Sequence, residues 1–288
     1  NFCSETVLWG HCWRGRSAEL VVEEFSILNK NYGKKAFLLN DDDFLFNRQR
    51  NIEFIERMSK SGLDIEFRAG ARVDTLLRDK DLLVSFRKVG LTALQVGVES
   101  FYQNTLDSMN KNYRSDRLKE AVECIKSAGI LYPCYFLVTG NENDNWKTMS
   151  SIIKKSKEYN FGVMHLSTLT PWPGTPLFEE MKTRGRIKDF DYRKYNLKNA
   201  VMSTKYLSTK QVALIRALLF YRWFFSPVVF IRNFFSNRYL RYAHLRTIFS
   251  LHLIRIYYLF MNLTKLWKVL WYNRMIDSIH REHLQLLS

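Results

Sequence analysis

Residues 36–43 read AFLLNDDD, a short apolar run followed at once by three aspartates, Asp41, Asp42 and Asp43. The next stretch, 47–61, carries its apolar residues at helical spacing. A strand followed by a helix is the repeating unit of a parallel sheet. The aspartates therefore stand just after a strand, which is where functional residues collect in folds of this class.

The same alternation extends to about residue 170. Strands are expected at 36–40, 65–69, 93–98, 132–139 and 163–169, and helices at 18–31, 47–61, 75–88, 115–128 and 145–159. Several helices stop at a glycine where a left-handed residue can close the last turn, namely Gly33, Gly62, Gly90, Gly129 and Gly162. Strand starts lie about 30 to 40 residues apart, one βαβ period each. The sequence predicts an α/β fold, a partial TIM-type (β/α)6 barrel lacking its first strand, followed by a C-terminal helical region.

Composition and charge divide the chain in two. With 47% apolar and 25% charged residues, the 288-residue chain is neither disordered nor fibrous. Residues 1–204 hold 31 Lys and Arg and 26 Asp and Glu, a net charge of +5, whereas 205–288 hold 13 and 2, a net charge of +11. We expect a core at 1–204 and a basic, aromatic-rich helical region at 205–288. Four cysteines without disulfide-scaffold spacing indicate a reducing, cytoplasmic compartment.

Five short motifs occur in a fixed order. The chain opens with NFCSE and continues with RGRSAELVVEE at 14–24, FLLNDDDFLFN at 37–47, LQVGVESF at 94–101 and TPWPGTPL at 170–177. Together they resemble the radical S-adenosylmethionine (SAM) superfamily, in its cobalamin-associated group. The resemblance covers residues 1 to about 185, with a fainter echo to about 235.

The resemblance gives the first cysteine a role. Phe2-Cys3 is similar to the end of the CxxxCxxC motif, in which an aromatic residue precedes the last of three cysteines. Cys3 would then ligate a 4Fe–4S cluster, whose fourth iron stays open for SAM. The other two cysteines would precede Asn1, which implies an N-terminally truncated chain that is inactive by itself. An electron from such a cluster splits SAM into methionine and a 5′-deoxyadenosyl radical.

The resemblance also assigns contacts to SAM. It implies that Asp41 or Asp42 receives the ammonium group and that Arg72 pairs with the carboxylate. Glu99 and Ser100 would contact the ribose or the methionyl part.

Two later turns complete the implied cofactor site. Gly140 stands on the adenine side, although GNENDN at 140–145 departs from the family's G-x-P-G-E-T-like turn. Pro173 belongs to a rigid turn suited to closing a site over a ligand.

Other interpretations of these residues stay open. The aspartates also fit a helix-capping turn or a metal site, and Arg72 also fits a salt bridge with Asp74 at the strand end. The remaining cysteines, Cys12, Cys124 and Cys134, are expected to be structural, and His11 and His165 are substrate-side candidates.

The implied function is a methyltransferase or ring-forming oxidative cyclase that acts on a hydrophobic, lipid- or tetrapyrrole-like substrate. Its cofactors would be SAM, a 4Fe–4S cluster and cobalamin, the last in a domain that commonly precedes the barrel. A flavodoxin or ferredoxin would be the reductant. An RNA-modifying methylthiotransferase-like enzyme and a non-catalytic relative remain alternatives, with nucleic-acid binding disfavoured because no RNA-binding module is recognisable.

The basic tail has three interpretations. A helix pair packing across the open side of the barrel is the leading one, and peripheral contact with the inner face of a membrane is the second. RNA binding is the third. Uncharged stretches in the tail reach nine residues, about half of a bilayer span, so no transmembrane anchor is expected.

Overall fold

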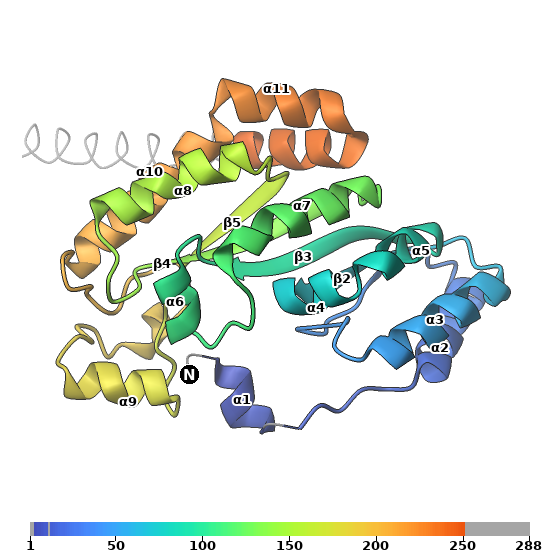
Figure 1. The fold of residues 1–288 in the computed structure, drawn as a ribbon, viewed down its shortest axis with the longest axis horizontal. Coiled ribbons are helices and arrows are strands. Elements are labelled where there is room, and N and C mark those ends of the chain that lie inside the picture. The colour runs from blue at the N-terminus through green and yellow to red at the C-terminus, as the bar shows by residue number, and fades with distance from the viewer. Residues whose placement is uncertain (1–2, 11, 251–288) are drawn as a thin grey trace, which may run out of the picture.

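A sheet of five parallel strands forms the centre of the molecule (Figure 1). The computed structural model describes residues 3–10 and 12–250. The strands lie in chain order: β1 (Ala36–Leu38), β2 (Glu66–Arg72), β3 (Leu91–Glu99), β4 (Tyr132–Thr139) and β5 (Val163–Thr168). Neighbours are parallel throughout, and helices connect them, as in a barrel wall. The expected partial TIM-type barrel is confirmed.

The connecting helices begin where the sequence places caps. The first two long helices are α2 (Ala18–Tyr32) and α3 (Arg48–Ser61), whose first turns are capped by the side chains of Ser17 and Asn47. Asn145 closes a capping box at the start of α8 (Trp146–Glu158). The other helices are α1 (Ser4–Trp9), α4 (Val73–Arg78), α5 (Leu83–Lys88), α6 (Gln103–Ser108), α7 (Leu118–Ser127), α9 (Pro176–Thr183), α10 (Thr209–Phe224) and α11 (Pro227–Ser236).

An aromatic cluster fixes the loop after β1. Phe54 of α3 packs edge-on against Phe44 and Phe67, with ring centroids 5.2 and 5.6 Å apart. All three side chains are almost completely buried. Because Phe44 directly follows Asp43, its burial anchors the acidic loop to the core.

Two expectations about helices are wrong. The helix expected at 75–88 is broken into α4, a short 3-10 turn and α5, because the buried carboxylate of Asp79 draws Arg48, Arg78 and Asn51 to the break. Gly162 does not close the helix before it; Asn160, at φ 56°, adopts the left-handed conformation instead.

The C-terminal helices pack on the sheet and share its core. α10 lies beside α8 and β5, and its Trp223 is completely buried. Two asparagines hold this region against the amino ends of the strands. Asn233 of α11 donates to the carbonyl of Gly162, and Asn237, between α11 and a helix over residues 238–250, donates to that of Leu131. Among the described helices none is by itself long and apolar enough to cross a membrane; α10 and α11 meet that criterion only as a pair bent by 51°.

Candidate functional site

A cavity of about 650 Å³ opens at the carboxyl ends of the strands. The start of the chain, the loop after β1 and the ends of β2 to β5 contribute to its wall. Of the residues selected from the sequence, it brings together Cys3, Asp41, Asp42, Arg72 and Glu99. These residues span almost a hundred positions of sequence, and the parallel topology places them at one edge.

Close backbone packing holds the acidic loop on this edge. The amide of Phe44 donates to the carbonyl of Gly70 on β2 over 2.9 Å. A Cβ at Gly70 would lie 2.7 Å from the carbonyl oxygen of Asp41, closer than real Cβ contacts allow. Position 70 therefore requires glycine for the loop to lie against β2.

The aspartates of the loop have different roles. Asp43 faces inward, where one carboxylate oxygen accepts from the hydroxyl of Thr75 over 2.9 Å, while its second oxygen is buried without a partner in the described part of the chain. Burial raises the pKa of Asp43, and burial together with the nearby Glu5 and Asp41 raises that of Asp42. Among the described residues, Asp42 and its neighbours Glu5 and Asp41 form no ion pair, although the charge of Arg50 acts on Asp41.

Glu99 ends β3 in an unusual conformation. Its φ is 61°, a left-handed value that is uncommon for a residue with a side chain, and the β3–β4 register shifts beside it. The carboxylate folds back to within 3.0 Å of the position that a Cβ of Gly97 would occupy. There it accepts a hydrogen bond from Lys111 over 2.8 Å, in a nearly buried ion pair.

Arg72 forms the ion pair that the sequence allowed as an alternative. Two of its nitrogens donate to the two carboxylate oxygens of Asp74, each over 2.9 Å. This hydrogen bonding raises the pKa of the Arg72 guanidinium. Since Arg72 also lines the cavity, Asp74 fixes the orientation of a cation at the cavity wall.

Three selected residues lie outside this cavity. Ser100 is buried and its hydroxyl accepts from the amide of Tyr102. Gly140 donates its amide to Asp144 and backs onto Val212 of α10. Pro173 is exposed in the turn before α9, and Phe2 lies outside the described residues, as does His11.

Some lining residues had no signal in the sequence. Lys111 stands in a loop without periodicity, and its pairing with Glu99 depends on tertiary structure. Leu197, at φ 64°, also lines the cavity, and its carbonyl accepts a hydrogen bond from the amide of Thr168. The segment after α9 therefore folds over the strand ends. Glu5 of α1 joins the acidic group.

The electrostatics suit an organic cation. The carboxylates of Glu5, Asp41 and Asp42 face the cavity, whereas its two cations, Arg72 and Lys111, are each paired with another carboxylate. The ammonium and sulfonium of SAM would be attracted to such a site.

The thiols fit part of a cluster site. Cys3 is exposed and lines the same cavity as the acidic loop. No group of three metal-ligating side chains occurs within residues 3–10 and 12–250. Cys12 is exposed outside the cavity, and Cys124 and Cys134 are partly or fully buried.

Comparisons with known proteins agree with this chemistry. The family description of the radical SAM superfamily matches residues 1–174. The anaerobic magnesium-protoporphyrin IX monomethyl ester cyclase of Rubrivivax gelatinosus is 31% identical over 82% of this chain and 42% of its own length. The bacteriochlorophyllide d C-12(1)-methyltransferase of Chlorobaculum tepidum is 28% identical over 74% of this chain and 46% of its own.

A solved structure shares the fold. The cobalamin-dependent SAM radical enzyme OxsB, with aqua-cobalamin and SAM bound, superimposes with a TM-score of 0.60 at 13% identity, over 83% of this chain and 42% of that one. The chain thus spans less than half the length of these three proteins.

Proposed function

Because this chain belongs to the radical SAM superfamily, we propose that it forms the SAM-binding core of an enzyme that cleaves SAM reductively at a 4Fe–4S cluster. Membership implies both cofactors. The observation that carries the proposal is the 650 Å³ cavity at one edge of the sheet. There the Cys3 thiol meets carboxylates that form no ion pair within the described part of the chain.

Each residue has a proposed role. Cys3 would ligate the cluster, with Phe2 beside it, and Asp41 or Asp42 would receive the ammonium of SAM. Arg72, oriented by Asp74, would take the carboxylate. Glu99 would contact the ribose or methionyl part, and Lys111 holds its carboxylate in place.

Three assigned residues would act from outside the cavity wall. Ser100 shapes the backbone that follows Glu99, since its hydroxyl caps the next turn. Gly140 and Pro173 would act through the turns in which they lie, on the adenine side and over the ligand.

When bound, the cluster would supply the electron that divides SAM into methionine and a 5′-deoxyadenosyl radical. The chain's own contribution is to bind and orient the cation. Trp172 and Leu197 would limit the access of water from the carboxyl edge. We propose that residues 1–204 carry this chemistry.

The reaction class follows from the relatives. A cyclase and a methyltransferase that are named for tetrapyrrole substrates favour a hydrophobic substrate of that kind for the full-length protein. Cobalamin is proposed as a further cofactor from the likeness to OxsB, and no described residue of the cavity is assigned to it. A flavodoxin or ferredoxin would supply the electron.

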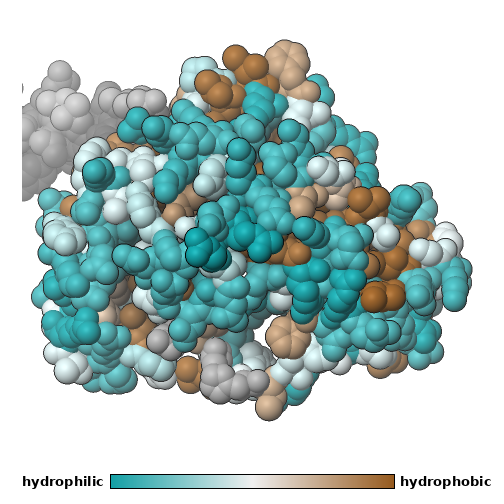
Figure 2. Space-filling model, viewed as in Figure 1, coloured by the Kyte–Doolittle hydropathy of each residue, from teal (hydrophilic) through white to brown (hydrophobic). Residues whose placement is uncertain are grey.

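Peripheral membrane contact is a second proposal, and it concerns the basic region at 205–288. Residues 205–250 hold eight Lys and Arg and no Asp or Glu. Each helix of this segment exposes apolar side chains at helical spacing: Leu214, Leu218, Tyr221 and Phe225; Val228, Ile231 and Phe235; and Tyr242, Leu245 and Phe249. Figure 2 shows the apolar surface over α11. Basic helices with an apolar stripe bind anionic lipid surfaces.

The test of the proposed function uses the full-length gene product after anaerobic cluster reconstitution. We expect the absorption of a 4Fe–4S cluster and, with a reductant, formation of 5′-deoxyadenosine from SAM. Cys3→Ala should abolish both, because it removes a cluster ligand. Cys124→Ala removes a thiol outside the cavity and is the matched control. It should retain both the cluster absorption and the formation of 5′-deoxyadenosine.

Variants of the cavity separate SAM binding from cluster binding. Asp42→Asn and Glu99→Gln should weaken SAM binding by about tenfold or more, as expected for a lost charge-assisted contact, with the cluster spectrum unchanged. Unchanged SAM affinity in both variants would contradict their roles, and cluster retention in Cys3→Ala would overturn the proposal itself.

A further inference from the structure

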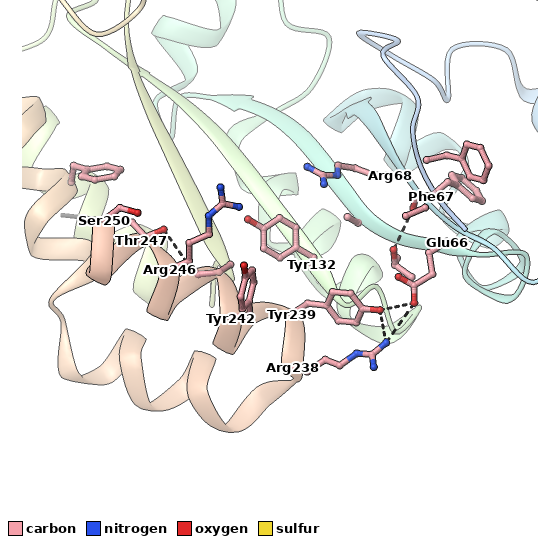
Figure 3. A pocket seen from close by; sticks show the side chains of 16 residues that line it. Glu66, Phe67, Arg68, Tyr132, Arg238, Tyr239, Tyr242, Arg246, Thr247 and Ser250 are labelled. Carbon is pink, nitrogen blue, oxygen red and sulfur yellow. Dashed lines mark hydrogen bonds and ion pairs between the residues drawn. The ribbon is translucent and has the colours of Figure 1, made fainter. Parts of the chain in front are cut away.

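A second cavity, of about 920 Å³, lies at the amino ends of the strands (Figure 3). Its floor comes from the first residues of β1 to β4, and its other wall from α10 and the helix at 238–250. It is distinct from the SAM cavity: the two share no lining residue.

The two cavities nevertheless lie on the same face of the sheet. Side chains alternate along a strand, so Arg68 and Arg72 of β2 point to one side, and Arg68 lines the second cavity while Arg72 lines the first. Arg72 lies four positions after Arg68, a rise of about 13 Å along the strand. The face is therefore a trough with one cavity at each end.

The second cavity carries cations without partners. Neither Arg68 nor Arg246 has a hydrogen bond or ion pair from its side chain to another described residue, and both guanidiniums are exposed to the cavity region. Figure 3 draws them on either side of Tyr132, whose hydroxyl likewise has no described partner. Burial raises the pKa of Tyr132, and both arginines act in the opposite direction, which agrees with their closeness to it.

The acid in the cavity is already neutralised. Glu66 accepts a hydrogen bond from the hydroxyl of Tyr239 and lies 3.7 Å from the guanidinium of Arg238. This leaves Arg68 and Arg246 as the uncompensated charges. The trough is consequently acidic at its carboxyl end and basic at its amino end.

The rest of the wall is apolar and aromatic. Phe37, Phe67, Phe220 and Tyr242 line the space around the arginines. Flat apolar groups pack well against such side chains, and a guanidinium pair is suited to a carboxylate, which it binds through paired N–H groups.

We propose that this cavity is a binding site for a flat, largely apolar molecule that bears a carboxylate, with Arg68, Arg246 and Tyr132 receiving the carboxylate. The two uncompensated arginines favour a carboxylate at this end of the trough, whereas Arg72 at the opposite end is already paired with Asp74. The site does not depend on the cluster or on the cleavage of SAM.

The test titrates the full chain with 1-pyrenebutyrate and follows its fluorescence, with 1-pyrenebutanol as the uncharged counterpart. We expect the acid to bind at least about tenfold more tightly than the alcohol. Arg68→Gln and Arg246→Gln should each weaken binding of the acid by about tenfold and leave the affinity for the alcohol unchanged. Far-ultraviolet circular dichroism checks that the variants are folded.

Two controls locate the site. Arg241→Gln removes an exposed cation from the same helix but outside the cavity, and Asp42→Asn alters the other cavity; both should retain wild-type affinity for the acid. Ala243→Trp, which fills the cavity, should weaken the binding of the acid and of the alcohol to the same extent. Equal binding of acid and alcohol, or full affinity in both arginine variants, would overturn the proposal.

Discussion

Aspartates of this protein lie in two opposite environments. Asp79 is completely buried and accepts hydrogen bonds from Arg48, Arg78 and Asn51. Although burial opposes it, this set of donors lowers the pKa of Asp79. Asp42 has no such donors among the residues that the structure describes, and burial beside other carboxylates raises its pKa. A satisfied carboxylate of the first kind stabilises the fold, whereas one of the second kind is available to a cationic ligand.

Asp79→Ala should lower the free energy of unfolding by about 2 to 3 kcal/mol, because it removes the buried acceptor of hydrogen bonds from Arg48, Arg78 and Asn51. Since the folded-state pKa is lowered, this contribution is present above the unfolded value of about 3.9 and is lost as the pH falls through the folded value. Urea unfolding of wild type and variant at pH 7 and near pH 3 measures it.

The matched control is Asp81→Ala, which removes the exposed carboxylate paired with Arg48. It should cost less than about 1 kcal/mol at neutral pH. Equal losses in the two variants would mean that burial of the Asp79 network contributes nothing to stability.

At the scale of elements, the sequence specified the strands well and the connections less well. All five strands form where apolar runs predicted them, because an apolar run between helices has one way to be buried. The break at Asp79 was missed because its cause is a set of partners 28 and 31 residues away. The periodicity of a local sequence does not report contacts with residues that are distant in the chain.

Gly70→Ala should disturb the contact between β2 and the acidic loop. The added Cβ would lie 2.7 Å from the carbonyl oxygen of Asp41, so the loop must move. We expect a loss of about 1 to 3 kcal/mol in the free energy of unfolding and weaker SAM binding in the reconstituted full-length protein. Chemical denaturation and calorimetric titration measure the two effects.

Gly129→Ala serves as its control. That residue has a φ of 73° and nothing near its Cβ position, so alanine there strains the backbone without a clash. Its cost of about 1 to 2 kcal/mol should leave SAM affinity unchanged. Were both variants to weaken SAM binding equally, the close contact at Gly70 would not be what positions the loop.

At the scale of the whole molecule, topology converts distant motifs into a site. Cys3, Asp42 and Glu99 were selectable from the sequence because motifs mark them, and the parallel sheet gathers them at one edge. Arg68 and Arg246 meet only through the docking of the C-terminal helices on the strand starts. Their cavity had no motif, and hence no sequence signal.

The C-terminal helices also carry a net positive charge on their surface. If they contact a membrane, binding of the chain to vesicles should depend on the charge of the lipid. The full chain should co-sediment with vesicles that contain anionic phosphatidylglycerol and much less with pure phosphatidylcholine, and salt should reduce the bound fraction. Arg222→Gln and Arg241→Gln remove exposed cations of this region, and each should lower the partition coefficient about fivefold, corresponding to about 1 kcal/mol per cation. Lys119→Gln, which removes an exposed cation of α7 outside the basic region, should have no effect. Equal binding to neutral and anionic vesicles, or no binding to either, would exclude an electrostatic membrane surface on these helices.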